Sequence, residues 1–173
     1  MIVIRHPRPA VAPGTCYGRL DLRPGPDAEA EIAAALASLP RRRPVLTSPA
    51  RRCRLLAERL AARDGGRPRL DPRLRELDFG AWEGRRWDAI DRAESDPWAA
   101  DPWGLAPPGG ETFAALHARV AAALDDAAPG AILVTHAGPI RAARMILLGE
   151  TFERVFAAPV PYATPVLIER IRA

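Results

Sequence analysis

Two histidines stand at the ends of apolar runs and are the residues most able to do chemistry in this sequence. Residues 1–6 read MIVIRH, and residues 131–136 read AILVTH. An imidazole can attack a phosphoryl group through one ring nitrogen when the other nitrogen is held protonated by an acceptor such as a backbone carbonyl. A lone histidine would usually be structural, but two in this setting favour catalysis. We therefore predict that His6 is a nucleophile for phosphate chemistry and that His136 lies beside it.

Arginines accompany this pair. A phosphoryl group in transfer carries negative charge on its oxygens, and the guanidinium group is permanently charged and can donate two parallel hydrogen bonds to it. Arg5 adjoins His6, and Arg52 lies in the first turn of a predicted helix, whose N-terminus itself favours an anion. Spacing alone does not distinguish Arg52 from its neighbours Arg51 and Arg54.

Hydrolysis of an ester with a poor leaving group also needs an acid. Glu76 lies in a half-apolar stretch, where partial burial would raise its pKa and keep it protonated near neutral pH. Asp78 and Glu83 lie in the same stretch, and local sequence does not exclude them. The third histidine, His117, is expected at a helix surface. Because the histidines lie far apart in the sequence, we expect no metal site and no cofactor.

Alternating strands and helices must position these residues. Apolar runs predict strands at 1–6, 45–48, 69–74, 131–136 and 166–171. Three- to four-residue spacing and capping residues predict helices at about 27–39, 48–64, 87–93, 111–127 and 138–149. Their first residues are Asp27, Ser48, Trp87, Glu111 and Gly138. The proline- and tryptophan-rich stretch that follows residue 93 is predicted to be a loop.

This order predicts an α/β fold with three layers, α/β/α, and a mainly parallel sheet with helices on both faces. Ligands bind such sheets at the carboxyl ends of the strands, where residues 5–6, 47–48 and 135–136 would project. The length of 173 residues favours a single domain over residues 1–173.

Composition restricts the class of protein. The net charge is +4 and every basic residue is arginine, but these arginines are scattered, so we do not expect nucleic-acid binding. No apolar run is long enough to span a bilayer, and the chain opens on a strand without a charged leader, so we expect no membrane partner and a cytoplasmic protein. Cys16 and Cys53 form no disulfide framework, which fits a reducing compartment. The sequence does not indicate the oligomeric state.

Five segments resemble the histidine phosphatase superfamily, which has the phosphoglycerate mutase-like fold, and they span nearly the whole chain: IRH at 4–6, TSP at 47–49 leading to an arginine at 52, LRELDFGAWEG at 74–84, GGET at 109–112 and VTHAG at 134–138. The resemblance implies that His6 forms a phosphohistidine. Arg5, Arg52 and His136 would hold the transferring phosphoryl group. Glu76 would protonate the leaving oxygen and then activate water.

Within the superfamily, CYGRLD at 16–21 and the FGxWEG pattern at 79–84 look most like α-ribazole phosphatases. Those enzymes remove the 5′-phosphate of α-ribazole phosphate in cobalamin biosynthesis, so the resemblance implies a small phosphate ester as partner. Arg19 and Tyr17 are then candidate substrate contacts, although a turn residue and a core aromatic explain them equally well. Glu111 would lie at the rim, in a loop that closes over substrate.

One position departs from the family pattern, which usually reads Arg-His-Gly. Pro7 has no N–H to donate, so one phosphate contact would be missing or supplied by Arg8. Three alternatives stay open: a broad-specificity phosphatase, a phosphoglycerate mutase-like enzyme and a non-catalytic phosphate-binding module. Mutases of this fold are generally longer, with a tail that retains the intermediate, whereas this chain stops at Ala173. Retention of His6 and Glu76 speaks against the binding module.

Overall fold

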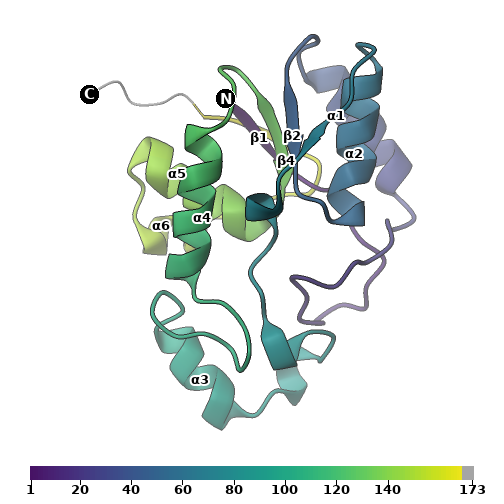
Figure 1. Ribbon diagram of the computed structural model, residues 1–173. Coiled ribbons are helices and arrows are strands. Elements are labelled where there is room, and N and C mark those ends of the chain that lie inside the picture. Colours follow the sequence, from purple (N-terminus) through teal and green to yellow (C-terminus); the bar gives the residue numbers. More distant parts are fainter. Residues whose placement is uncertain (169–173) are drawn as a thin grey trace.

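The central sheet has the strand order β3-β2-β4-β1-β5 (Figure 1). The computed structural model describes residues 1–168. Its strands are β1 (Ile2–Arg5), β2 (Val45–Thr47), β3 (Arg69–Leu70), β4 (Ile132–Thr135) and β5 (Pro165–Leu167). The first four are parallel to one another, and β5 is antiparallel to β1. The prediction of a mainly parallel sheet is confirmed.

Helices cover both faces of this sheet (Figure 1). The α-helices are α1 (Ala28–Ser38), α2 (Arg51–Ala62), α3 (Arg92–Ala100), α4 (Phe113–Asp125), α5 (Ala137–Leu148) and α6 (Phe152–Ala157). Helices α1 and α2 lie on one face, α4 and α5 lie on the other, and α3 lies apart from the sheet (Figure 1). Within residues 1–168, no helix is long and apolar enough to cross a membrane.

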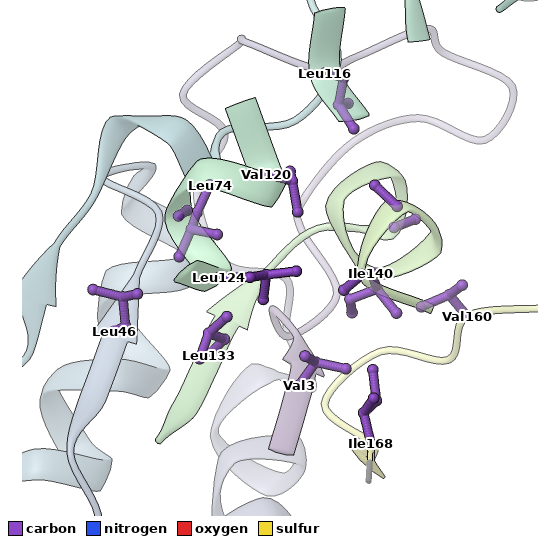
Figure 2. Close-up of a cluster of buried hydrophobic side chains, with 14 of the residues drawn as sticks. Val3, Leu46, Leu74, Leu116, Val120, Leu124, Leu133, Ile140, Val160 and Ile168 are labelled. Atoms are coloured by element: carbon purple, nitrogen blue, oxygen red, sulfur yellow. The ribbon is translucent and has the colours of Figure 1, made fainter. Parts of the chain in front are cut away.

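Each face of the sheet has its own core, because neighbouring residues of a strand point to opposite faces. Val3 belongs to the cluster under α4 and α5, whereas Ile4 belongs to the cluster under α1 and α2. Figure 2 shows the first cluster, in which Val3 and Leu133 of the strands face Val120 of α4 and Ile140 of α5. This two-sided packing gives the rigid parallel core whose strand ends carry the histidines.

Two element boundaries differ from the prediction. Helix α2 begins at Arg51 with Ala50 as its N-cap, not at Ser48. The Ser48 hydroxyl accepts a 3.3 Å bond from the Ala50 N–H, but the Ser48 N–H still donates to the Val134 carbonyl of β4, so Ser48 continues the sheet hydrogen bonding and does not begin the helix. Strand β3 stops at Leu70 because Pro72 opens a 3-10 turn, Pro72–Leu74, that Asp71 caps. The edge position expected for this proline-containing segment is confirmed.

The remaining differences are local. Asp27 occupies the N-cap of α1 as predicted, but its side chain makes no capping bond. The helix expected at 87–93 is a 3-10 turn, Trp87–Ala89, followed by α3, which carries on through the stretch predicted to be a loop. Thr112, not Glu111, precedes α4 and caps it. Helix α6 was not predicted. The last strand ends at Leu167, and residues 169–171 of that prediction lie outside the described residues.

Candidate active site

The two histidines lie at adjacent strand ends. Arg5 of β1 and Thr135 of β4 are register partners, so the residues that follow them, His6 and His136, emerge side by side. Their rings lie edge to face with centroids 5.0 Å apart, and each residue is only 1% exposed. The parallel register therefore joins two residues that are far apart in the sequence, as the topology predicts.

Hydrogen bonds fix which nitrogen of His6 is free to react. Nδ1 lies 2.7 Å from the carbonyl oxygen of Pro7, which can only accept, so Nδ1 carries the proton. Nε2 lies 3.2 Å from Nε of Arg52, which can only donate, so Nε2 presents its lone pair. This neutral tautomer is the one that nucleophilic attack through Nε2 requires.

Arg52 holds both histidines from the first turn of α2. Besides its bond to His6, its Nη2 lies 3.2 Å from Nδ1 of His136. The same guanidinium donates to the carbonyl oxygens of Gly18 at 2.6 Å and Leu20 at 2.5 Å. The residue is 1% exposed, and all four acceptors are neutral. A buried cation in neutral surroundings attracts an anion to this place.

The neighbouring arginines of α2 lie elsewhere. Arg51 is exposed, and Arg54 pairs with Glu58 on the outer surface of the helix at 2.9 Å. Sequence spacing left the choice among Arg51, Arg52 and Arg54 open, and the family resemblance favoured Arg52. Of the three, the structure brings Arg52 against the histidines.

His136 has the opposite tautomer. Its Nδ1 must accept from Arg52, so Nε2 carries the proton and donates to the Ser48 hydroxyl at 2.9 Å. Ser48 is fully buried at the end of β2, the strand next to β4. The sequence analysis assigned Ser48 to a helix cap, and its contact with His136 was missed.

Burial keeps both imidazoles uncharged. Burial lowers the pKa of His6 well below its usual value of 6.5, the positive charges of Arg52 and Arg5 lower it further, and the hydrogen bond to Pro7 opposes them. The pKa of His136 is also well below that value, mainly because of burial and then because a proton on His136 would be repelled by Arg52 and by a protonated His6. At neutral pH His6 therefore needs no separate base to remove a proton from Nε2.

Arg5 packs on Tyr162, a residue that the sequence analysis did not single out. Its guanidinium carbon lies 3.8 Å from the Tyr162 ring centroid, and its Nη1 donates to the Val160 carbonyl at 2.7 Å. The Tyr162 ring also lies 5.6 Å from that of His6. Nε of Arg5 is buried without a hydrogen-bond partner in residues 1–168. An unpartnered donor beside the nucleophile suits the binding of an anion.

Arg8 lies over the same tyrosine. Its guanidinium carbon is 4.7 Å from the Tyr162 ring centroid, its side chain is 60% exposed, and its backbone N–H donates to Glu31 at 2.6 Å. Within residues 1–168, no hydrogen bond joins the Arg8 side chain to His6 or His136. A contact of Arg8 with the phosphate, in place of the N–H donor that proline lacks, stays a prediction.

Glu76 is held from several sides. Its Oε1 accepts from the backbone N–H groups of Leu77 and Gly138, each at 3.0 Å. Its backbone carbonyl accepts from Arg19 Nε at 3.0 Å and from Arg119 Nη2 at 3.1 Å. Gly138 leaves the room for this carboxylate, because a Cβ at that position would lie 2.3 Å from Oε1 of Glu76. The fold fixes both the backbone and the side chain of the proposed acid.

A polar pocket of about 150 Å³ brings Glu76 and His136 together with Arg19 and Arg75. The other two candidate carboxylates, Asp78 and Glu83, bind backbone N–H groups. Glu83 accepts from four backbone N–H groups and joins two loops, with donors at Gly18, Arg19, Leu20 and Phe79. Asp78 accepts from the Gly80 N–H at 2.9 Å. Of the three carboxylates that local sequence left open, only Glu76 lines the pocket.

The three predicted substrate contacts have different surroundings. Arg19 lines the polar pocket with a side chain that is 30% exposed. The Tyr17 hydroxyl is 2.8 Å from that of Tyr162, and burial and this bond raise the pKa of Tyr17 above its ordinary value. Glu111 is occupied by Arg119, at 2.6 and 2.8 Å. Burial alone would raise the pKa of Glu111, but Arg119 and Arg19 outweigh it and the pKa is lowered. Direct contact of these three residues with substrate stays a prediction.

Two positioning residues had no local signal in the sequence. Arg119 on α4 binds the carbonyls of Arg73 and Arg75 as well as that of Glu76, and Tyr162 comes from the loop before β5. Both act across long sequence separations, which residue spacing cannot show.

Among residues 1–168, no group of three His, Cys, Asp or Glu side chains could hold a metal ion. His117 lies beside Trp103, with ring centroids 5.4 Å apart, outside this constellation.

Comparisons with known proteins identify the family of this chain. The family model of the histidine phosphatase superfamily, branch 1, matches residues 1–172. No protein of curated function matches the sequence significantly. Among solved structures, the protein TTHB049 from Thermus thermophilus is 32% identical, with a TM-score of 0.75 over 95% of this chain and 89% of that one.

Two further solved structures carry names that describe activities. A phosphoglycerate mutase from Thermus thermophilus is 32% identical, with a TM-score of 0.75 over 95% of this chain and 89% of the other. A mycobacterial glucosyl-3-phosphoglycerate phosphatase is 27% identical, with a TM-score of 0.78 over 95% and 87%. The match of the family model over almost the whole sequence, together with these structures, shows that the chain belongs to the histidine phosphatase superfamily.

Proposed function

We propose that this protein is a phosphomonoesterase that works through a phosphohistidine on His6. The observation that carries the proposal is the state of His6: Nδ1–H is fixed on the Pro7 carbonyl and the Nε2 lone pair faces Arg52. A neutral, oriented imidazole under a buried guanidinium is suited to attack an electrophile that carries negative charge.

The proposed reaction has two halves. An incoming phosphate takes over hydrogen bonds from Arg52 and from the unpartnered Nε of Arg5, which frees Nε2 of His6 to attack phosphorus. The ester P–O bond breaks as the leaving oxygen takes a proton from Glu76. Water then attacks the phosphohistidine, Glu76 takes a proton from it, and the P–N bond breaks to release phosphate and neutral His6. Proton and electron counts balance over the cycle.

As substrate we propose a small phosphate ester, with α-ribazole 5′-phosphate of cobalamin biosynthesis as the first candidate. The support is the resemblance of the segments at 16–21 and 79–84 to α-ribazole phosphatases, together with their contact here. Glu83 joins the two segments through its bonds to the N–H groups of Gly18 and Phe79. We also propose that the protein is cytoplasmic.

A phosphoglycerate mutase-like activity is the second candidate. It is favoured by one observation, the 32% identity to a phosphoglycerate mutase from Thermus thermophilus. The two candidates differ in the fate of the phosphohistidine, which water attacks in one and a second substrate hydroxyl attacks in the other. A broad-specificity phosphatase would share the first fate but show a flat substrate profile.

The test is a steady-state comparison of kcat/KM over α-ribazole 5′-phosphate, 3-phosphoglycerate, a sugar phosphate and an aryl phosphate, with His6→Ala as the inactive control. A preference of about a hundredfold for the ribazole ester, close to 3 kcal/mol of selective transition-state binding, would support the substrate. A flat profile would refute it and keep the phosphatase. If the wild type showed no more turnover than His6→Ala on any of these esters, the phosphatase function itself would be refuted.

A further inference from the structure

Glu76 lines a second pocket besides the polar one that it shares with His136. This second pocket, here called the aromatic pocket, has a volume of about 80 Å³. Its main wall residues are Leu77, Phe79, Trp98, Phe113, Arg141 and Phe156. It is therefore a largely apolar recess that borders the proposed general acid.

The walls of the aromatic pocket come from separate parts of the fold. Phe79 follows the Glu76 loop, Trp98 belongs to α3, and Phe113 and Phe156 belong to α4 and α6. Ring contacts join them in two pairs, with centroids of Phe79 and Trp98 at 5.9 Å and those of Phe113 and Phe156 at 5.1 Å. Convergence of four elements on one apolar recess next to a catalytic carboxylate is typical of a substrate pocket.

Two polar side chains in these walls make few hydrogen bonds within residues 1–168. Arg141 donates from Nε to the Val155 carbonyl at 3.1 Å and lies over Phe156 at 4.8 Å, and this is its only side-chain hydrogen bond in residues 1–168. Burial lowers its pKa. The indole Nε1 of Trp98 is buried without any hydrogen-bond partner in the same described residues. A buried donor without a partner, such as this indole N–H, is rare, because it costs free energy until an acceptor arrives.

We propose that the aromatic pocket binds the apolar body of the leaving alcohol, and that Arg141 faces an acceptor or anionic group on it. This rests on the proposed phosphatase function, because an acid that protonates the leaving oxygen must touch it. The rest of the alcohol then begins beside Glu76, and an apolar body gains more from the aromatic pocket than from the polar one.

The size of the pocket narrows the substrate class. A cavity of about 150 Å³ is enough for one benzene molecule, so a recess of about 80 Å³ covers part of one ring or a short alkyl chain. The class is therefore phosphate esters of alcohols with an apolar body of up to one ring. In α-ribazole 5′-phosphate the ribose stands between the leaving oxygen and the fused two-ring base, so the base would reach the aromatic pocket across the sugar and enter it by one edge.

Benzyl phosphate and methyl phosphate test this proposal, because their leaving alcohols have similar acidity and differ in apolar body. We expect kcat/KM to favour the benzyl ester by about tenfold or more in the wild type, as one apolar group in a fitting pocket commonly does. Phe156→Ala should lower this ratio by about threefold or more. The matched control is Leu70→Ala, since Leu70 is 49% exposed on the edge strand β3, away from the pocket, and it should keep the ratio.

A binding measurement separates the pocket from the proposed function. Calorimetry on the wild type should give about tenfold tighter binding of benzylphosphonate than of methylphosphonate. The wild type should bind 4-carboxybenzylphosphonate more tightly than benzylphosphonate, and Arg141→Met should remove this difference in affinity. Ratios below these values, or an unchanged ratio in Phe156→Ala, would overturn the aromatic pocket as the leaving-group site. Selective binding of benzylphosphonate without turnover of any ester would support the aromatic pocket as a ligand site and refute the phosphatase function.

Discussion

Replacing Arg52 by methionine removes the cation that the site is built around while keeping much of the side-chain volume. Arg52 directs Nε and Nη2 at the two histidines, and it is 1% exposed. Loss of one preorganised donor to a developing oxyanion lowers kcat by about 10²–10³, or about 2.7–4 kcal/mol. Because two donors and the charge are lost together here, we expect kcat/KM to fall by about 10³ for Arg52→Met.

Arg51→Met is the matched control, because Arg51 precedes Arg52 on the same helix and is exposed. The assay is phosphate release from an aryl phosphate and an alkyl phosphate, with circular dichroism to confirm that each variant folds. Inorganic phosphate gives a second readout: at a hundred times its Kd it should stabilise the wild type by about 2.7 kcal/mol and leave Arg52→Met almost unchanged. A loss below tenfold in Arg52→Met, or an equal loss in Arg51→Met, would refute the reasoning.

Three further predictions concern the acid and the histidines. Glu76→Gln should slow alkyl phosphates at least tenfold more than aryl phosphates, because only a poor leaving group needs the proton; equal losses on both would remove Glu76 as the acid. Gly138→Ala should show the same pattern, since its Cβ would lie 2.3 Å from Oε1 of Glu76, and an unaltered substrate profile would contradict this. For His6 and His136, whose pKa values are lowered by folding, the unfolded chain binds more protons below pH 6.5, so stability is full above that pH and is lost as the pH falls. Urea unfolding should show a loss of up to about 1.4 kcal/mol per pH unit for each histidine, and a pH-independent midpoint between pH 7 and pH 5 would contradict it.

The strand ends were predictable from sequence because their signal is local and strong. An apolar run that ends in a polar residue needs only a parallel sheet to bring that residue to the ligand-binding edge. His6 and His136 satisfy this rule, and the register of β1 with β4 provides the contact. The choice of Arg52 depended on the resemblance, because helical periodicity places several arginines near the start of α2 and only the path of the chain after β2 decides which one faces inward.

The supporting residues were not predictable, because they act through the backbone of distant segments. Arg119 binds three carbonyls of the loop that carries Glu76, and Glu83 binds four N–H groups in two loops. In both cases the partner is a main-chain atom, which any sequence provides, so no residue pattern marks the pair. For the same reason the sequence left Asp78 and Glu83 as rivals of Glu76, and only the positions of their donors separate them.

Pro7 shows how a departure from a family pattern has to be judged atom by atom. The absence of an N–H at position 7 suggested a missing phosphate contact. The structure shows that position 7 also contributes its carbonyl, which accepts from Nδ1 of His6 at 2.7 Å and so sets the tautomer of the nucleophile. Proline retains that acceptor, and its fixed φ restricts the loop that presents it. A proline after the histidine therefore preserves the contact that orients His6, and in the proposed mechanism the anion-binding donors are those of Arg5 and Arg52.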